Sequence, residues 1–266
     1  MVMKIGFIGG GNMAEALLKG MTARGAKDIL VSDPSEERRT YLKQTYKVET
    51  TESNIKIVAA CDIIILAVKP QVMNTVTEEI GGEVTDSKTI VSIAAGITLA
   101  YLSSRLKTRK LIRVMPNTPA LVQKGMTAMS LCECFSDRDV AAVRDIFMSI
   151  GEVITLPEKY MDAITALSGS GPAFFALFVE AMIESGIKMG LTRDDASTLA
   201  VQTSIGTSRM LETGMNPVSL RKMVTSPGGT TAAGLKTFNE KGFKDIVSAA
   251  LASAKNRSEE LGKGRS

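Results

Sequence analysis

Residues 226–231 have the composition of an anion-binding loop. They read Ser-Pro-Gly-Gly-Thr-Thr, and small residues follow them into a predicted helix near Leu235. Pro227 fixes one backbone torsion, whereas Gly228 and Gly229 permit positive φ and close approach of a ligand. Backbone N–H groups and two hydroxyls at a helix N-terminus would favour a small anion such as a carboxylate. The same residue types are typical of a turn that only caps a helix, so the segment alone leaves both interpretations open.

A second ligand-binding pattern lies near the N-terminus. The apolar run at residues 4–8 has strand length and passes directly into Gly9-Gly10-Gly11-Asn12-Met13-Ala14, which opens an amphipathic stretch. This is the glycine fingerprint of dinucleotide-binding folds, in its required place between a strand and a helix. We expect Gly9 to make the tight turn, Gly11 to admit the pyrophosphate and Ala14 to keep the helix close to the sheet. The segment therefore predicts a dinucleotide site at a helix N-terminus.

The second predicted strand, residues 29–32, ends at Asp33, where an acidic residue is expected to meet the adenosine ribose. A carboxylate there favours NADH, because it accepts from the free ribose hydroxyls and repels a 2′-phosphate. Ser32, Arg38 and Arg39 lie close by in the sequence and offer the alternative of accommodating that phosphate. The two arginines also fit a solvated helix face. The predicted cofactor is therefore NADPH or NADH, with the preference open.

Composition excludes several classes of function. The 266 residues include no histidine, which excludes His-dependent dehydrogenases, Ser-His-Asp hydrolases and His-ligated metal enzymes. With 32 basic and 28 acidic side chains, the net charge of +4 gives no indication of nucleic-acid binding. No uninterrupted apolar run reaches the roughly 18 residues of a membrane span, and a strand at the N-terminus leaves no room for a signal peptide. We therefore expect a cytoplasmic protein that binds neither nucleic acid nor a membrane; the three cysteines, Cys61, Cys132 and Cys134, predict no metal site.

Strand-like and helix-like segments alternate over the first half of the chain. Predicted strands are residues 4–8, 29–32, 63–68, 89–93, 111–115, 128–131 and 153–156, and predicted helices are residues 35–46, 53–60, 71–80 and 137–149. This alternation is typical of a doubly wound α/β sheet. From Tyr160 onward only helical periodicity remains. We predict a Rossmann-type dinucleotide-binding domain over residues 1–157 and an all-α substrate-binding and dimerisation domain over residues 158–266.

Three loops follow the carboxyl ends of predicted strands, where sheets of this kind bind ligands. They are Lys69-Pro70-Gln71, Ala94-Ala95-Gly96 and Pro116-Asn117-Thr118-Pro119. Small residues in the second loop would let the nicotinamide end of a cofactor lie against the sheet edge. Lys69 fits a role at a cofactor phosphate or ribose, and a solvated lysine is the alternative.

The helical half carries more apolar residues than a single helix stripe requires. Pro172 suits the first turn of a new helix. The apolar residues that follow, from Phe174 to Ile183, indicate burial on more than one side. This surface predicts packing against a second subunit.

In these segments the chain resembles the pyrroline-5-carboxylate reductases over nearly its full length, with the motifs in the family's order. Many dehydrogenases share the glycine loop, whereas Ser-Gly-Ser-Gly-Pro-Ala at residues 168–173 and Ser-Pro-Gly-Gly-Thr-Thr at residues 226–231 are far more specific. The other matching segments are residues 7–14, 67–70, 94–96, 115–119 and 165–167.

The resemblance implies reduction of 1-pyrroline-5-carboxylate to L-proline with NAD(P)H, the last step of proline biosynthesis. It implies a homodimer with interlocking helical domains, and in many members dimers assemble into decamers. Thr231 matches the family's threonine beside the pyrroline nitrogen, and Gly229, Thr230 and Thr231 match the loop that receives the substrate carboxylate. Asp33 departs from some members, which have a serine able to meet the 2′-phosphate. The motifs and the resemblance together predict these cofactor-binding residues: Ile8, Gly9, Gly10, Gly11, Asn12, Met13, Asp33, Asn54, Ala67, Val68, Lys69, Pro70, Ala94, Ala95 and Gly96.

A cyclic imine suits a site without histidine, because its nitrogen can arrive protonated and hydride transfer then needs alignment more than a strong acid. We predict that Thr231 hydrogen-bonds the ring nitrogen as the catalytic residue, with a helix cap alone as the alternative. A β-hydroxyacid dehydrogenase is the nearest rival enzyme, but it needs a lysine and an asparagine on one helical face. Lys188 is the only candidate lysine, and no asparagine lies one turn along. A redox sensor or scaffold would lose the loop at residues 226–231, which is intact here.

Overall fold

The computed structural model of the chain describes residues 3–132 and 137–263. Cys134 lies outside these ranges. By its contacts the described chain divides into two units: one takes the residues up to Ser170 together with those from Ala254 onward, and the other is Gly171–Ser253. Each unit is described by itself, and the functional boundary expected after residue 157 stays a prediction.

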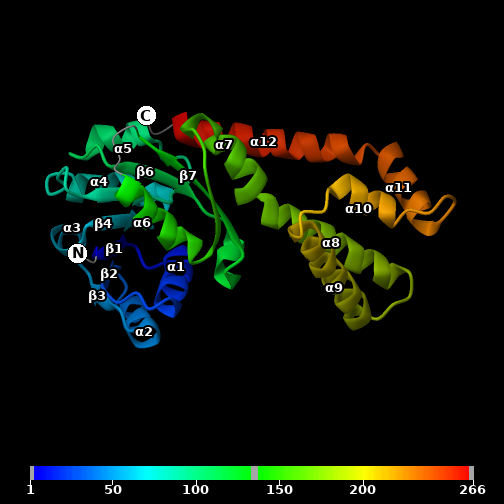
Figure 1. Cartoon of the computed structure of the whole chain (residues 1–266), viewed down its shortest axis with the longest axis horizontal. Helices are drawn as coiled ribbons and strands as arrows, with labels where there is room; N and C mark the ends of the chain where they lie inside the picture. Colours follow the sequence, from blue (N-terminus) through cyan, green and yellow to red (C-terminus); the bar gives the residue numbers. More distant parts are fainter. Residues whose placement is uncertain (1–2, 133–136, 264–266) are drawn as a thin grey trace. The chain divides into compact units, whose positions relative to one another are not determined.

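The first unit holds the sheet of Figure 1, in which β1, β2, β3, β4, β6 and β7 are labelled. Its described strands follow the order β3-β2-β1-β4-β5-β6-β7-β8. Neighbouring strands are parallel except β6 and β7, so β7 and β8 run opposite to the rest. The order reverses between β1 and β4, which is the switch point at which such sheets bind ligands. The strands are β1 (Ile5–Ile8), β2 (Ile29–Ser32), β3 (Glu49–Thr51), β4 (Ile63–Leu66), β5 (Thr89–Ser92), β6 (Leu111–Met115), β7 (Gly125–Leu131) and β8 (Gly151–Thr155). The predicted Rossmann-type α/β class is confirmed.

Helices cover both faces of the sheet, and β4 shows how its sequence allows this. Ile63 and Ile65 belong to the core cluster on one face, with α1 (Asn12–Ala23), α2 (Glu36–Tyr46) and α6 (Asp137–Met148). Ile64 and Leu66 belong to the cluster on the other face, with α3 (Asn54–Ala60), α4 (Met73–Ile80) and α5 (Leu99–Arg105). Side chains alternate between faces along a strand, so a central parallel strand is apolar throughout.

Two short elements were absent from the sequence prediction. The strand β3 has three polar residues and pairs in parallel with β2, at the edge of the sheet. The helix α5 has seven residues and is capped by Thr98, whose hydroxyl accepts from the N–H of Tyr101. Elements this short carry too little periodicity to be recognised, and their neighbours stabilise them.

The described part of the second unit is entirely helical, as predicted. Its helices are α8 (Gly171–Lys188), α9 (Arg193–Glu212), α10 (Pro217–Met223), α11 (Thr230–Glu240) and the greater part of α12 (Phe243–Lys263). Pro172 lies in the first turn of α8, as expected. The rings of Phe178, Phe238 and Phe243 pack on one another with centroids 5.1 to 6.4 Å apart, joining α8, α11 and α12.

Large apolar side chains of the second unit remain exposed in the single chain. Phe175 and Leu177 are exposed by 69% and 63%, and α11 has no buried residue. One helical stretch of the described chain, Glu158–Lys188, is also long and apolar enough to cross a membrane by length and composition. Counting uninterrupted apolar residues missed this stretch, because small and acidic residues interrupt it. Length and composition alone are weak evidence for a span, and an apolar surface that packs on another protein meets the same test.

Candidate active site

The glycine loop between β1 and α1 has the geometry that a bound pyrophosphate needs. Gly9 has φ +96°, and a Cβ there would lie 2.7 Å from the carbonyl oxygen of Ala67. Gly11 is the N-cap of α1, and a Cβ added to it would meet nothing within 4 Å. No side chain caps α1, so its first-turn N–H groups have no side-chain acceptor at the cap. Ala14 is fully buried against the sheet. These residues therefore fit a dinucleotide, and their individual roles stay predictions.

At the end of β2, Asp33 is held by two backbone donors. Its Oδ2 accepts from the N–H of Gly10 at 2.8 Å, and its Oδ1 accepts from the N–H of Ser35 at 2.9 Å. The carboxylate thus lies directly beside the glycine loop. Asn54, which only the resemblance pointed to, lies here as well: it accepts from the hydroxyl of Ser32 at 2.6 Å and donates to Glu79 at 2.7 Å.

The loops after β4 and β5 lie along the same carboxyl edge of the sheet. The N–H of Ala67 donates to the carbonyl oxygen of Ile8, which joins the loop after β4 to the end of β1. Lys69 is exposed, and its side chain has no hydrogen-bond or ion-pair partner among the described residues, so it remains available to a ligand. In the loop after β5, Gly96 has φ +73°, and a Cβ there would lie 3.4 Å from the backbone carbonyl of Leu261. The end of α12 therefore packs on this loop, which sequence reasoning missed.

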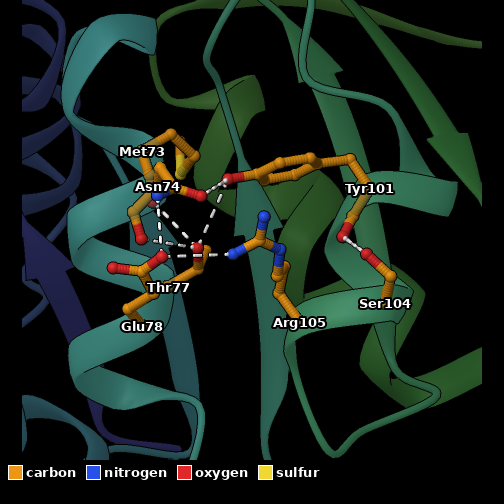
Figure 2. A network of polar contacts seen from close by, with 7 residues as sticks. All are labelled: Met73, Asn74, Thr77, Glu78, Tyr101, Ser104 and Arg105. Atoms are coloured by element: carbon orange, nitrogen blue, oxygen red, sulfur yellow. Dashed lines mark hydrogen bonds and ion pairs between the residues drawn. The ribbon is translucent and has the colours of Figure 1, made fainter. Parts of the chain in front are cut away.

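A polar network holds α4 against α5 behind these two loops (Figure 2). Asn74 donates to Glu78 at 2.8 Å and accepts from the hydroxyl of Tyr101 at 3.4 Å. Arg105 pairs with Glu78 at 3.4 Å and lies over the Tyr101 ring, 5.5 Å from its centroid. Because α4 and α5 follow the loops after β4 and β5, this network fixes the spacing of the two loops. No motif in the sequence signals it.

The loop after β6 contacts the segment that leads into α8. The side-chain amide of Asn117 donates to the carbonyl oxygen of Ser168 at 3.1 Å and accepts from the N–H of Met126 at 2.8 Å. A Cβ on Gly169 would lie 2.7 Å from the end of Met115. Two of the segments that resemble the family, residues 115–119 and 168–173, therefore touch each other. The segment Thr165–Gly169 is a π-helix, a rare distortion that often accompanies functional sites.

In the second unit, residues 226–231 form the N-terminus of α11. Gly228 has φ +71°, and a Cβ on Gly229 would lie 2.4 Å from the hydroxyl oxygen of Ser226. Gly229 is the N-cap, no side chain caps the helix, and Thr230 and Thr231 are its exposed first two residues. The loop therefore offers unpaired first-turn N–H groups and two hydroxyls, as an anion site requires.

The structure brings the predicted cofactor-binding residues together at one edge of the sheet, from the ends of β1, β2, β4 and β5 and the start of α3. The predicted substrate-binding residues 229–231 lie in the second unit. Cys61 is no competing nucleophile, because burial raises the pKa of its thiol to about 11.

The fold and the residues at the sheet edge define a Rossmann-type oxidoreductase that uses a nicotinamide cofactor. Family models match residues 4–96, as "NADP oxidoreductase coenzyme F420-dependent", and residues 158–261, as "Pyrroline-5-carboxylate reductase dimerisation". A pyrroline-5-carboxylate reductase from Synechocystis is 39% identical over 99% of this chain and 100% of its own length. The chain belongs to the pyrroline-5-carboxylate reductase family.

Solved structures agree with this assignment. A pyrroline-5-carboxylate reductase from Coxiella burnetii superposes with a TM-score of 0.93 at 35% identity, covering 98% of this chain and 99% of the other. A pyrroline carboxylate reductase from Plasmodium falciparum, solved with NADP bound, gives a TM-score of 0.87 at 33% identity and covers 98% of each chain. The similarity therefore includes both units and not the sheet alone.

Proposed function

We propose that this protein is an NAD(P)H-dependent enzyme that reduces 1-pyrroline-5-carboxylate to L-proline, the last step of proline biosynthesis. Family membership over the full length supports the reaction. The observation that carries the proposal is the fold of residues 226–231: a positive-φ Gly228 leads into a helix whose first-turn N–H groups no side chain caps. Such an N-terminus suits the carboxylate of this substrate.

In this proposal the residues at the sheet edge hold the cofactor. Gly9, Gly10 and Gly11 admit its pyrophosphate to the N-terminus of α1, with Ile8, Asn12 and Met13 alongside. Asp33 and Asn54 lie at the adenosine end. The loops at residues 67–70 and 94–96 line the nicotinamide end, where Lys69 is free to bind a phosphate or ribose oxygen. The bound nicotinamide supplies the hydride.

The residues of the second unit orient the imine. The first-turn N–H groups of α11, from Thr230 and Thr231, bind the carboxylate with Gly229 allowing its close approach. The hydroxyl of Thr231 accepts from the protonated ring nitrogen and so holds the neighbouring carbon in one orientation. If the free imine binds, the same hydroxyl donates and water supplies the proton. Orientation of this kind lowers the barrier by several kcal/mol without a strong acid.

One assay tests the reaction. The purified protein is mixed with pyrroline-5-carboxylate and either NADH or NADPH; loss of the reduced nicotinamide is followed, and proline is quantified in the product. We expect one proline for each nicotinamide oxidised. A β-hydroxyacid acceptor, tested in reverse with the oxidised cofactor, is the control for the rival enzyme class. Turnover of that acceptor in place of the imine would overturn the proposal.

The chain self-associates as its family's dimerisation region implies, and we propose that the dimers assemble further, into a decamer, in the cytoplasm. The exposed apolar residues of α8 support a protein–protein interface on that helix. We propose that the protein binds neither membranes nor nucleic acids. Light scattering of Phe175→Glu is expected to show a smaller species than wild type, with Glu180→Gln, an exposed position on the same helix, as the control. Flotation of the wild type with lipid vesicles would contradict the absence of membrane binding.

A further inference from the structure

Four side chains form a cluster behind the glycine loop, which we call the anchor cluster: Glu15 of α1 and Arg38, Tyr41 and Tyr46 of α2. The Oε1 of Glu15 accepts from the hydroxyls of Tyr41 at 2.8 Å and Tyr46 at 2.9 Å, and its Oε2 pairs with Arg38. Burial raises the pKa of Glu15, but the hydrogen bonds from Arg38 and the two tyrosines outweigh burial, so the net pKa is lowered. The carboxylate thus stays charged opposite the guanidinium.

Within the anchor cluster, Arg38 is contacted on several sides. Its Nε donates to the carbonyl oxygen of Gly10, inside the glycine loop, and its guanidinium carbon lies 5.1 Å from the centroid of the Tyr41 ring. Arg38 therefore lies next to the adenosine end of the proposed cofactor site. Its Nε donor is held by Gly10, and Glu15 binds its Nη2 and opposes its charge.

The other candidates for a 2′-phosphate are occupied as well. Arg39 donates to the backbone carbonyls of Asp33 at 2.7 Å and Pro34 at 2.9 Å, so it stabilises the turn itself. Ser32 is fully buried, and its hydroxyl lies 2.6 Å from Asn54 and 3.3 Å from the carbonyl oxygen of Phe7. Ser32 cannot meet a phosphate without giving up these contacts. Arg39 is tied to the turn through Nη1, and its Nη2 lies 4.0 Å from the carboxylate of Glu52.

The Asp33 carboxylate, in contrast, is fixed beside the glycine loop by the N–H groups of Gly10 and Ser35. Each of its oxygens accepts one of these bonds and keeps a further lone pair for a ribose hydroxyl. A 2′-phosphate at the same place would meet a like charge, while the nearby Arg38 and Arg39 are already engaged by Glu15 and by the turn after β2. Like-charge contacts cost binding free energy.

We propose that this chain prefers NADH, with Asp33 as the residue that selects it and Glu15 as a positioning residue that withholds Arg38 from a 2′-phosphate. The inference rests on the proposed function, because it concerns the cofactor of that same site. It assigns the preference for NADH to two carboxylates: that of Asp33, which faces the ribose, and that of Glu15, which lies behind the glycine loop.

Binding titrations without substrate test the proposal, since they measure dissociation constants of NADH and NADPH independently of turnover. We expect wild type to bind NADH at least about tenfold more tightly than NADPH. Asp33→Ser should lower that ratio about tenfold or more, by weakening NADH and strengthening NADPH. Asp33→Asn, which keeps an acceptor oxygen for one of the two backbone donors, serves as a second variant if the serine variant has a much lower melting temperature.

The role of Glu15 is tested by adding further substitutions to the Asp33→Ser variant and measuring NADPH binding. Adding Glu15→Gln should strengthen NADPH binding about threefold, because Arg38 is released, and adding Arg38→Met as well should remove that gain. Glu37→Gln, an exposed position on α2 that also loses one negative charge, is the matched control and should change the ratio by less than about twofold. Melting temperatures are recorded for every variant.

The outcomes separate this inference from the proposed function. If wild type binds NADPH as tightly as NADH or more tightly, the preference is overturned while the reductase assay stands. If Asp33→Ser weakens both cofactors equally, or if the Glu15 and Glu37 variants behave alike, the assigned roles are overturned. If neither nicotinamide binds, the proposed function fails together with the inference.

Discussion

The helices α1 and α11 begin in the same way, yet the rest of the chain supports them very differently. Each has a glycine N-cap, Gly11 or Gly229, with no side-chain cap, and a positive-φ glycine lies just before it. Behind its N-terminus α1 buries six residues: Ala14, Ala16, Leu17, Leu18, Gly20 and Met21. The helix α11 buries none. A single chain therefore buries α1, the helix of the proposed cofactor site. It leaves α11, the helix of the proposed substrate site, without a buried residue.

The difference predicts distinct roles for the proposed cofactor site at α1 and the proposed substrate site at α11. A pyrophosphate site built on a buried helix is rigid before the ligand arrives, so its residues act mainly through shape. A helix without buried residues depends on whatever covers it, and the family's dimerisation region includes all of α11. We therefore expect substitutions of the glycines before α1 to act on cofactor affinity, and substitutions at the start of α11 to act on turnover and substrate affinity.

The largest effect is expected from Gly11→Ala. An added Cβ meets no protein atom within 4 Å, so the fold tolerates it, but it occupies the space in which the pyrophosphate approaches the backbone. The dissociation constant for NADH should rise roughly 30-fold, which corresponds to about 2 kcal/mol. Calorimetric titration checks the affinity, and a melting curve checks the fold.

Gly82→Ala is the matched control for that variant, because its Cβ also meets nothing within 4 Å and the residue lies away from the glycine loop. It should bind NADH as wild type does. Equal affinities for the two variants would show that Gly11 does not border the cofactor. The proposed role of the α1 N-terminus in cofactor binding would then be contradicted.

Thr231→Val should lower kcat roughly tenfold or more, because it removes one positioned hydroxyl while keeping the shape of the side chain. NADH affinity and melting temperature should stay close to wild type, since Thr231 is exposed and no helix cap depends on its hydroxyl. Thr237→Val, farther along the same helix and also exposed, is the control. Unchanged steady-state kinetics for Thr231→Val would remove the residue from its proposed role.

The strand, turn and helix that carry the proposed cofactor site could be predicted from the sequence, because their signal is local. A strand, three glycines and a helix stand side by side at residues 4–14, and every backbone requirement of the turn is met by those residues. The apolar run of β4 predicted a strand buried on both faces for the same reason.

Contacts between distant residues left no such signal. The bond from Asn117 to Ser168 joins positions 51 residues apart, and the packing of Leu261 on Gly96 joins the last helix to the loop after β5. The anchor cluster was missed as well, because nothing in the sequence pairs Glu15 and Tyr46 with Arg38 until α1 and α2 are placed side by side. Tertiary packing, rather than local preference, decides such contacts.

A smaller effect is expected from Gly228→Ala, which sharpens the comparison on the side of α11. With φ at +71° and open space around the new Cβ, the cost is backbone strain of about 1 kcal/mol. The KM for the imine should rise about threefold to fivefold as the loop spends less time in its binding form. Gly214→Ala carries the same kind of strain at φ +89° in another turn, and it should lower stability similarly without changing KM. A matching rise in KM for both variants would assign the effect to general loosening of the helices.

The smallest effect concerns Glu15, which ties α1 to α2 and has no counterpart in the first turn of α11. Hydrogen bonds from Arg38, Tyr41 and Tyr46 hold its pKa below the ordinary value of 4.5, in spite of burial. A carboxyl with a lowered pKa in the folded state stabilises the fold above its ordinary pKa, and that contribution is lost as pH falls through the folded-state value. Glu15→Gln should therefore be less stable than wild type to urea at neutral pH, and the two unfolding curves should converge below about pH 4.5. Glu37→Gln, which is exposed on α2, should track wild type at every pH. A Glu15→Gln deficit of constant size down to strongly acidic pH would mean that packing, and not the charged carboxylate, joins the two helices, and α1 would then owe its rigidity to its buried face alone.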